Sequence, residues 1–327
     1  MSILVVQAGS LTTIQDRGRF GYQKSGIGQA GAMDQAAYAA ANKLAGNIAG
    51  VPALEMTMLG ATLKFEETCQ CGLTGADMQA TLDGVPVQTY TAFKVEAGQT
   101  LACGFAKSGL RGYLAVQGGF AVPKVLGSCS TDIKSKLGGY QGRALKNGDV
   151  LEIGPSDKMP PIYKTLPAPK FPETILVRAI PGPQYDYFTE RGQEIFFSAR
   201  YEITPESDRM GIRLNGRAIE SVAGVDIVSD GITFGSVQIP ANGMPIILMA
   251  DHQTAGGYAK IATVVSEDLP LLAQAKPGNC VKFIKCSVEE MQLAPMSKVM
   301  DLVEKLPPPP KAKSKGLWGA LKEMLGL

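Results

Sequence analysis

The chain has 327 residues, of which 45% are hydrophobic and 19% are charged, and its formal net charge is +2. This length allows two domains or one large β domain, and the composition is that of a protein with a sizeable apolar core. Because no long basic stripe runs through the body of the chain, nucleic acid is excluded as the expected partner.

The cysteines indicate whether the protein binds a metal, and the N-terminus indicates where in the cell it is found. None of the six cysteines forms a Cys-x-x-Cys pair and the chain has one histidine, so we expect no metal site. The N-terminus lacks the basic start and the apolar run of a signal peptide, and no apolar run approaches the roughly 20 residues that cross a bilayer. We therefore expect a cytoplasmic protein with reduced thiols and without stable membrane insertion.

Glycine and proline are frequent, at 38 and 21 residues, which favours turns and short strands. The first strand is predicted at residues 3–6. The polar loop that follows contains Asp16, Arg17 and Arg19, and it can present a forked guanidinium group to an anion or a carboxylate. The alternative is a solvated loop with an internal pair between the aspartate and an arginine.

The strongest helix signal begins at Asp34, a residue type that caps helix N-termini. Alanines and Leu44 supply helix-forming residues, and Gly46 predicts the end of the helix. Helix N-termini also bind anions, so residues 31–35 can hold a carboxylate or a phosphate. The alternative role for Asp34 is capping alone.

Short strands separated by turns are predicted from Ala53 to Ile153, and Asp83-Gly84 is a hairpin signal. Their close, regular spacing favours a barrel or a sandwich. The strands predicted in this part of the chain are residues 63–65, 78–82, 93–95, 112–116 and 150–153.

A second polar cluster lies in the same part of the chain. Arg111 precedes a strand, and the glycine-flanked hydroxyls of Ser128, Ser130 and Thr131 come before Arg143. Such a cluster can cradle a phosphate or a carboxylate. The spacings of a Walker A loop and of a Gly-x-Ser-x-Gly elbow are both absent.

Residues 154–172 hold six prolines and little apolar pattern, which predicts a domain boundary. We expect an N-terminal half at residues 1–155 and a C-terminal half at residues 173–295. The second half starts with a predicted strand at residues 175–180, and a charged loop around Arg209 follows.

The motif Asp251-His252-Gln253-Thr254-Ala255-Gly256-Gly257-Tyr258 is the richest in chemistry. It lies between two apolar runs, residues 245–250 and 261–265, which are typical of buried strands. Two glycines allow a sharp turn or a close approach to a ligand. His252 is the only histidine, so imidazole chemistry at neutral pH has to use it. The alternative is a polar turn that joins two strands.

Similar turn-and-strand segments occur at residues 95–101, 146–153 and 276–283. They indicate two halves built from related β units, with convergent turn chemistry as the alternative. The tail, residues 296–327, differs from the body. Pro307 to Pro310 predict a stiff spacer, and a short helix with one apolar face is predicted to follow it.

Taken together, six stretches in order resemble the allophanate hydrolase subunit 2 family. This biotin-dependent carboxyltransferase-like family includes KipA and the C subunit of the bacterial 5-oxoprolinase. The matching stretches are Gln15-Asp16-Arg17-Gly18-Arg19, Gly31-Ala32-Met33-Asp34, Thr74-Gly75-Ala76-Asp77, Gly127-Ser128-Cys129-Ser130-Thr131-Asp132, Ser207-Asp208-Arg209-Met210-Gly211 and the motif at residues 251–258. The sequence departs from the family pattern at Cys129, where arginine is expected, and at Ala255, where threonine is usual.

The resemblance implies a mainly β fold with a few short helices, built as two cyclophilin-like β-barrel units. It also implies that the chain is the C subunit of an ATP-dependent 5-oxoprolinase complex, which opens 5-oxo-L-proline to L-glutamate with ATP bound by the complex. The implied partners are a subunit 1 homologue (the B subunit of 5-oxoprolinase, or KipI-like) and a third lactam-utilisation subunit. Two alternatives stay open: a biotin-dependent carboxyltransferase subunit, as in urea carboxylase, and a KipA-like regulator that relieves inhibition of a histidine kinase.

A small amide or lactam substrate needs oxyanion-type donors and an arginine that binds a carboxylate. We expect the catalytic residues to be Asp251, His252 and Gln253. The substrate-binding residues are expected among the polar loops: Asp16, Arg17, Asp34, Arg111, Ser128, Ser130, Thr131, Arg143, Arg209, Thr254 and Tyr258.

Overall fold

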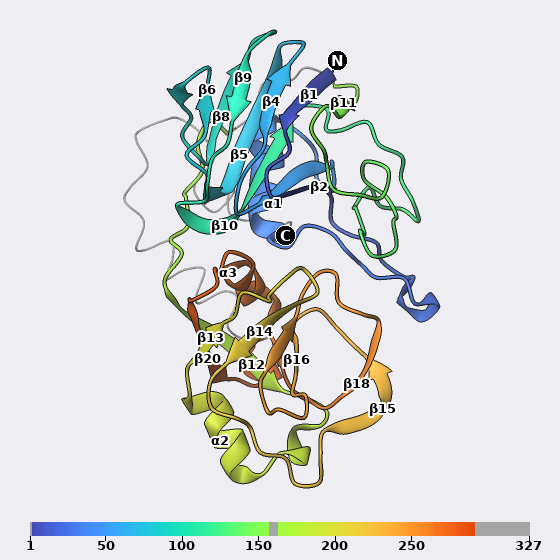
Figure 1. The fold of residues 1–327 in the computed structure, drawn as a ribbon, viewed down its shortest axis with the longest axis vertical. Helices are drawn as coiled ribbons and strands as arrows, with labels where there is room; N and C mark the ends of the chain where they lie inside the picture. The colour runs from blue at the N-terminus through green and yellow to red at the C-terminus, as the bar shows by residue number, and fades with distance from the viewer. Residues whose placement is uncertain (1, 157–162, 292–327) are drawn as a thin grey trace.

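The computed structural model describes residues 2–156 and 163–291, and it consists of two β units, one above the other in Figure 1. The N-terminal unit contains strands β1 to β11, and the C-terminal unit contains strands β12 to β20. The predicted tail, with its proline spacer and short helix, lies outside the described residues. Within those residues, no helix combines the length and the apolar character needed to cross a membrane.

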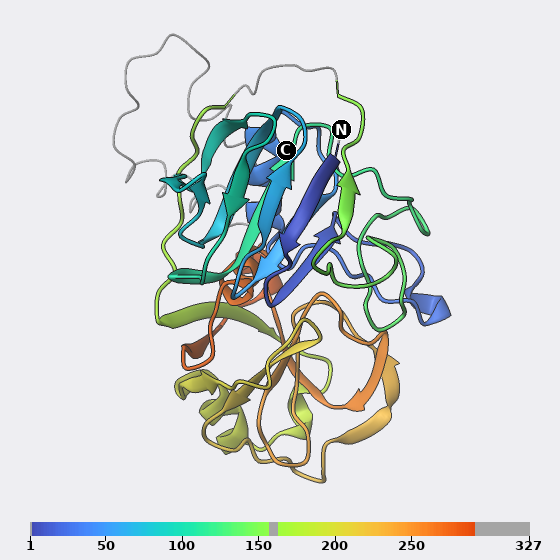
Figure 2. The same cartoon turned by 45° about the horizontal axis from the view of Figure 1, so that its top comes forward.

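The N-terminal unit has two sheets. The six-stranded sheet contains, in order, β11 (Val150–Glu152), β1 (Ser2–Gln7), β4 (Thr62–Phe65), β9 (Thr100–Ala102), β6 (Thr81–Leu82) and β7 (Val85–Pro86). Figure 2 shows this sheet with β11 beside β1. The five-stranded sheet contains β2 (Leu11–Gln15), β3 (Ala53–Thr57), β10 (Ser108–Val116), β5 (Cys69–Asp77) and β8 (Thr91–Val95).

One apolar core joins the two sheets, because alternate side chains of each strand point to the same face. Val5 and Phe65 come from the six-stranded sheet, and Leu54 and Leu114 from the five-stranded one. Each is fully buried, which contributes about 1.5–3 kcal/mol per side chain.

Helix α1 (Gln35–Ala45) covers the outer face of the five-stranded sheet. As predicted, the side chain of Asp34 caps it by accepting a hydrogen bond from the Ala37 amide at 2.8 Å, and Gly46 ends it with a φ of 79°. The helix lies directly on the sheet, since a β-carbon at Gly72 would come within 2.3 Å of the Ala41 carbonyl oxygen. This second layer explains why β10 is buried on both faces.

The C-terminal unit is a closed barrel. Its strands are, in order, β12 (Thr174–Pro181), β19 (Lys260–Val264), β16 (Ser236–Gln238), β17 (Ile246–Leu248), β14 (Gly211–Asn215), β13 (Tyr201–Ile203) and β20 (Cys280–Lys285). The barrel closes through a parallel pair, β12 with β20. The charged loop predicted around Arg209, at residues 207–214, ends earlier in the structure, because β14 starts at Gly211 and pairs with β17.

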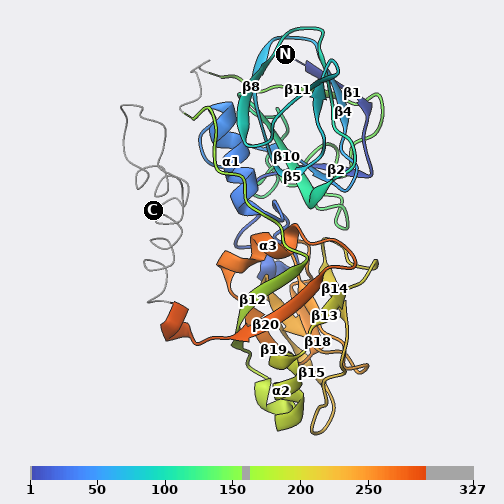
Figure 3. The ribbon, with the colours of Figure 1, turned by 90° about the vertical axis from the view of Figure 1, so that its left-hand side faces the viewer.

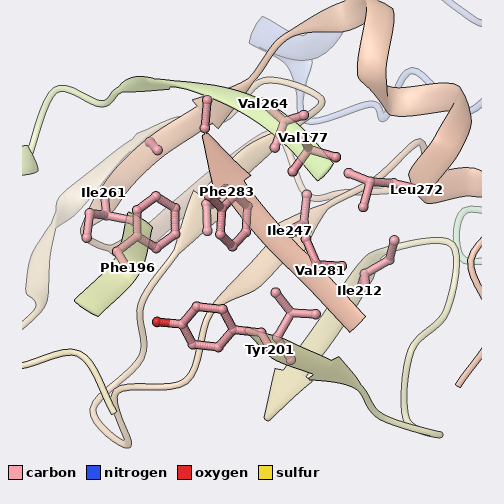
Figure 4. Packing of buried hydrophobic residues seen from close by; sticks show 14 of the residues in the cluster. Val177, Phe196, Tyr201, Ile212, Ile247, Ile261, Val264, Leu272, Val281 and Phe283 are labelled. Carbon is pink, nitrogen blue, oxygen red and sulfur yellow. The ribbon is translucent and has the colours of Figure 1, made fainter. Parts of the chain in front are cut away.

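Aromatic rings from α2 (Glu190–Ser198), β13 and β20 pack in the core of this barrel, and Figure 4 shows those of Phe196, Tyr201 and Phe283. The rings of Phe196 and Phe283 are stacked with centroids 4.3 Å apart, and Tyr201 meets Phe283 edge-on at 6.0 Å. Such pairs contribute about 0.5–1.5 kcal/mol beyond their buried area.

Two further strands, β15 (Asp226–Gly231) and β18 (Ala255–Tyr258), form a separate two-stranded ribbon. The second half of the predicted motif is therefore a strand of its own and not only a connection between strands. Its pairing with β15 supplies the backbone hydrogen bonds that a loop would lack.

Short helices complete the fold. Helix α3 (Leu269–Ala273) lies at the junction of the two units, which Figure 3 shows from the side. The 3₁₀ turns are η1 (Gln23–Ser25), η2 (Tyr185–Tyr187) and η3 (Ser266–Asp268).

Most predicted strands are present with different ends, but the strand predicted at residues 78–82 is wrong in its first half. Only Thr81 and Leu82 pair, as β6. Gln79 has a φ of 50°, and its amide bonds to the Asp77 side chain at 3.0 Å. This turn after β5 is local side-chain capping of the kind that competes with strand pairing.

The three similar segments share one local geometry. The turn glycines Gly98, Gly148 and Gly278 have φ values of 88°, 86° and 87°, a region in which glycine meets no steric penalty. Each turn leads into a strand, β9, β11 or β20.

Candidate functional site at the junction of the two units

Arg209 lies buried at the junction and connects the units. Its Nε and Nη2 donate to the two carboxylate oxygens of Asp251 at 2.8 Å each. On the side of the N-terminal unit, Nη1 donates to Glu55, and Nη2 donates to the Gly31 carbonyl at 2.7 Å. Burial by itself lowers the pKa of Arg209, but Asp251 and Glu55 outweigh burial and raise it. Arg209 is therefore a fixed cation between two carboxylates.

Glu55 is held in place by its cross-strand neighbour. Glu55 on β3 pairs in register with Tyr113 on β10, and the tyrosine hydroxyl donates to Glu55 Oε2 at 2.8 Å. The Met33 amide donates to the same oxygen at 2.8 Å, and the Asp34 amide donates to the Tyr113 hydroxyl at 2.8 Å. Burial, together with Glu55, raises the pKa of Tyr113, so the hydroxyl keeps its proton and remains a donor.

Gln274, which follows α3, inserts its amide into the N-terminal unit. Its Oε1 accepts from the Leu110 and Arg111 amides at 3.0 Å each. Its Nε2 donates to the Arg111 carbonyl at 3.0 Å and to Asp34 Oδ2 at 2.8 Å. The pairing of β10 with β5 shifts register between Ser108 and Gly112, so the glutamine satisfies backbone groups that the sheet leaves open.

Asp34 and Arg111 complete this buried network. Burial raises the pKa of Asp34 to about 6. Arg111 donates from Nη1 to the Ala273 carbonyl at 2.5 Å, and burial lowers its pKa. The structure thus brings together four of the predicted site residues, Asp34, Arg111, Arg209 and Asp251, but their charged groups bind one another and nearby backbone.

A second buried network surrounds Asp16. Its Oδ1 accepts from the hydroxyls of Ser128 and Ser130 at 2.6 and 2.5 Å, and its Oδ2 accepts from the Cys129 amide at 2.6 Å. Thr131 donates its hydroxyl to the Ile14 carbonyl at 2.9 Å. These polar groups are again satisfied internally, and they fix the loop at residues 128–131 to the end of β2.

Arg19 supports the same loop from its other side. It is fully buried, and it donates to the carbonyls of Val125 at 3.0 Å and Ser130 at 2.9 Å. The predicted pair between Asp16 and a neighbouring arginine is therefore wrong for Arg19, because both residues bind the 125–130 segment and not each other.

His252 is only 4% exposed, and its Nδ1 lies 2.7 Å from the Gln253 carbonyl oxygen. A carbonyl can only accept, so Nδ1 carries the proton. Burial lowers the pKa of His252, so the imidazole is neutral at pH 7. A β-carbon at Gly28 would lie 3.7 Å from both the His252 carbonyl oxygen and Asp132 Oδ2, which places the loop before α1 between these two residues.

The next two residues of the motif are free to meet a ligand. The side chains of Gln253 and Thr254 are partly exposed and form no hydrogen bond with the part of the chain that the structure describes. The Asp251 carboxylate is bound by Arg209, and Nδ1 of the His252 ring is bound by the Gln253 backbone carbonyl. The available chemistry of the motif is therefore an amide and a hydroxyl.

The side-chain amides of Gln238 and Gln253 both lie beside Gly256. A β-carbon at Gly256 would come 2.8 Å from Gln238 Nε2 and 3.3 Å from Gln253 Nε2. Gln238 is buried and donates to the Tyr258 carbonyl at 3.4 Å. Glycine is needed here because both amides approach the backbone of β18.

A pocket of about 260 Å³ opens between the two units, and no residue of the 251–258 motif is among those that line it. The lining residues are Arg17, Phe20, Gln29, Ala30 and Gln35 of the N-terminal unit and Phe234 of the C-terminal unit. Phe234 is close in the chain to Ile232, whose amide donates to the Thr254 carbonyl at 3.1 Å. Arg17 is exposed, so it is the residue of the first polar loop that a ligand can reach.

The structure places two predicted site residues away from these networks. Arg143 donates to both carboxylate oxygens of Asp149 at 2.7 and 2.8 Å and stacks on the Tyr140 ring, all within the N-terminal unit. Tyr258 lies on β18 with 41% of its surface exposed.

Sequence reasoning missed Glu55, Tyr113 and Gln274. The available signal was a carboxylate inside an apolar run, since Glu55 stands between Leu54 and Met56 in a strand. A buried acid of this kind needs a partner. Within the ranges that the structure describes, no group of three or more His, Cys, Asp and Glu residues is placed to hold a metal ion.

Known proteins resemble this chain over most of its length. Residues 25–285 match the family described as carboxyltransferase domain, subdomain A and B. The chain is 42% identical to the C subunit of 5-oxoprolinase from Haemophilus influenzae over 286 residues, which covers 88% of this chain and 92% of that protein. It is also 42% identical to the C subunit of 5-oxoprolinase from Escherichia coli, with the same coverage over 289 residues.

A solved structure shares the fold as well. The crystal structure of the K. lactis urea amidolyase superimposes with a TM-score of 0.85 at 27% sequence identity. The match covers 96% of this chain and 20% of the larger enzyme.

Proposed function

Since this chain belongs to the carboxyltransferase-domain family with subdomains A and B, we propose that it is the C subunit of a 5-oxoprolinase complex. The observation that carries the proposal is the 42% identity to two proteins of that name over nearly their whole length. The reaction is the ATP-dependent opening of the cyclic amide 5-oxo-L-proline to L-glutamate. The partners are a subunit 1 homologue and a third lactam-utilisation subunit.

The junction of the two units supplies residue types suited to a small amide. Gln253 and Thr254 offer an amide and a hydroxyl, and Arg17 offers a guanidinium group at the pocket. A pocket of about 260 Å³ is smaller than the roughly 300–1,000 Å³ typical of drug-sized ligands, which favours a small metabolite. We assign the binding of substrate to these three residues.

The predicted catalytic residues Asp251 and His252 take different roles in this proposal. Asp251 acts through Arg209, which fixes the start of the motif against the N-terminal unit. The neutral His252 ring donates a hydrogen bond to the backbone carbonyl of Gln253 and so orients the Gln253 backbone. Both are positioning residues, and Gln253 and Thr254 are the residues of the motif that meet the substrate.

ATP is the cofactor that the family resemblance implies, but the buried arginines do not fit a nucleotide. Arg209 is held by two carboxylates, Arg111 by a backbone carbonyl, and Arg19 by two carbonyls. None can turn to a triphosphate without leaving a buried partner unsatisfied. We therefore assign the nucleotide to one of the partner proteins.

Reconstitution tests the proposal. The purified chain, the subunit 1 homologue and the lactam-utilisation subunit are mixed with ATP and 5-oxo-L-proline, and L-glutamate is measured. Glutamate should form only when all three are present. Full turnover by this chain alone, or none by the complete mixture, would reject the proposal.

A biotin-dependent carboxyltransferase is the second candidate, favoured by the family description and by the structural match to urea amidolyase. In that case the substrate would accept a carboxyl group from carboxybiotin. Capture of a biotinylated carrier protein by this chain, with carboxyl transfer to a small amide, would favour this candidate over lactam hydrolysis.

A further inference from the structure

We infer that the side-chain amide of Gln253 recognises the cyclic amide group of a lactam by pairing with both its N–H and its carbonyl oxygen. The inference rests on the proposed function and deepens it by assigning the substrate's amide edge to one side chain. It starts from the position of Gln253 at the junction, directly after His252, whose carbonyl oxygen lies beside Gly28.

The chemistry of the two groups is complementary. A small lactam ring holds its amide in the cis form, so its N–H donor and its carbonyl acceptor point to the same side. A primary carboxamide also presents a donor and an acceptor along one edge. The two edges can form a pair of antiparallel hydrogen bonds, which a linear trans amide cannot offer in the same geometry.

The structure leaves this edge of Gln253 available while holding the residue in place. Among the described residues, neither its Oε1 nor its Nε2 takes part in a hydrogen bond. Its backbone carbonyl is bound to His252 Nδ1 at 2.7 Å, and its Nε2 lies close to Gly256. An unpaired amide can bind a ligand without first giving up a hydrogen bond within the protein.

The ribbon supports this position. Lys260 is buried and donates to Asp230 Oδ2 at 2.6 Å and to the Gly231 carbonyl at 3.2 Å, which ties β15 to the barrel. Since β15 pairs with β18, the strand that begins two residues after Gln253 is held by β15.

The first test is Gln253→Glu in the assembled complex, with 5-oxo-L-proline as the probe. A carboxylate keeps the shape but loses the donor, so KM should rise at least about tenfold. Protonation of the new side chain restores a donor, so the ratio of variant to wild-type KM should fall as pH is lowered toward about 4.5. A merely structural role would not give this pH dependence.

Gln88→Glu is the matched control. Gln88 is exposed in the N-terminal unit and, in the part of the chain that the structure describes, has no hydrogen-bond partner. The same chemical change there should leave KM and its pH dependence at wild-type values.

The second test compares the lactam with its lactone, 5-oxotetrahydrofuran-2-carboxylate, which lacks the N–H. The lactone is measured as a competitive inhibitor of the wild-type complex. Its inhibition constant should be at least about tenfold higher than the KM for 5-oxo-L-proline. Gln253→Ala should bind both weakly and lose the preference. A preference that survives in Gln253→Ala would overturn the inference.

The two proposals fail in different ways. A complex that opens 5-oxo-L-proline with the same KM in wild type and Gln253→Glu would keep the function and reject the role of Gln253. If the complex does not turn over 5-oxo-L-proline, the function fails, and ligand-observed NMR of the complex with the same compound decides the inference. Binding that Gln253→Ala abolishes would support it, and absent or unchanged binding would reject it.

Discussion

Arg209 and Asp251 meet through two parallel hydrogen bonds, Nε to Oδ2 and Nη2 to Oδ1, each 2.8 Å long. This forked pairing occupies both carboxylate oxygens. It also ties the motif to the N-terminal unit, because the same guanidinium group binds Glu55 and the Gly31 carbonyl. The position of Gln253 and Thr254 therefore depends on contacts that both units make.

Replacing Arg209 by methionine should destabilise the protein strongly. The change leaves Glu55 and Asp251 buried without their cation, and breaking a buried pair in this way costs about 3–5 kcal/mol. The free energy of unfolding, measured with urea, should fall by that amount. Arg191→Met on the exposed surface of α2 is the control and should change it by less than about 0.5 kcal/mol. Equal stability of the two variants would contradict the role of Arg209.

Gln274→Ala should weaken the junction between the units. Without the amide, the Leu110 and Arg111 amides and Asp34 lose a partner, and each unsatisfied buried group costs about 1–3 kcal/mol. Hydrogen exchange should show faster exchange of the Leu110 and Arg111 amides, with protection of the barrel strand β20 nearly unchanged. Uniform loss of protection in both units would instead indicate that Gln274 acts on global stability.

Asp34 should make stability fall as pH rises. Its pKa in the folded state is raised to about 6 from an ordinary value of 3.8, so between these values the folded chain holds a proton that the unfolded chain has lost. Roughly two pH units at about 1.4 kcal/mol each correspond to about 3 kcal/mol. The difference in unfolding free energy between wild type and Asp34→Asn should decrease by that amount from about pH 4 to about pH 7.

The control for this measurement is Asp186→Asn, the same change at an exposed position in η2. Its difference from wild type should vary by less than about 0.5 kcal/mol over the same range. A flat difference for Asp34→Asn would show that the carboxyl group ionises as freely in the folded protein as in the unfolded chain.

His252 should titrate below its ordinary pKa of 6.5, because burial disfavours the charged ring. As it is the only histidine, its Hε1 resonance in proton NMR is unambiguous. The midpoint should lie below 6.5 in the folded protein and near 6.5 in urea. By linkage, the stability that neutral His252 contributes is present above pH 6.5 and is lost as pH falls below it. A folded-state midpoint that is not lowered would contradict the buried, neutral ring.

Local patterns in the sequence determined the parts of the fold that depend on neighbouring residues. The cap at Asp34, the stop at Gly46 and the turn at Asp83-Gly84 are all present, with Asp83 and Gly84 at φ values of 47° and 84°. These features need only a few adjacent groups, so their residue types predict them. The motif at residues 251–258 was also visible, because acid, imidazole, amide and hydroxyl follow one another without interruption.

Only the tertiary structure decided which polar groups remain free. In the sequence, Asp16, Arg17 and Arg19 belong to one polar loop and cannot be told apart. The fold buries Asp16 and Arg19 against residues more than 100 positions away in the chain, and it leaves Arg17 in the wall of a pocket. Within the motif, Arg209 occupies the carboxylate of Asp251, whereas the Gln253 amide has no hydrogen bond among the described residues. A buried charge must be paired, and the partner is set by which strands the fold brings together, so the division between structural and ligand-binding residues follows from packing.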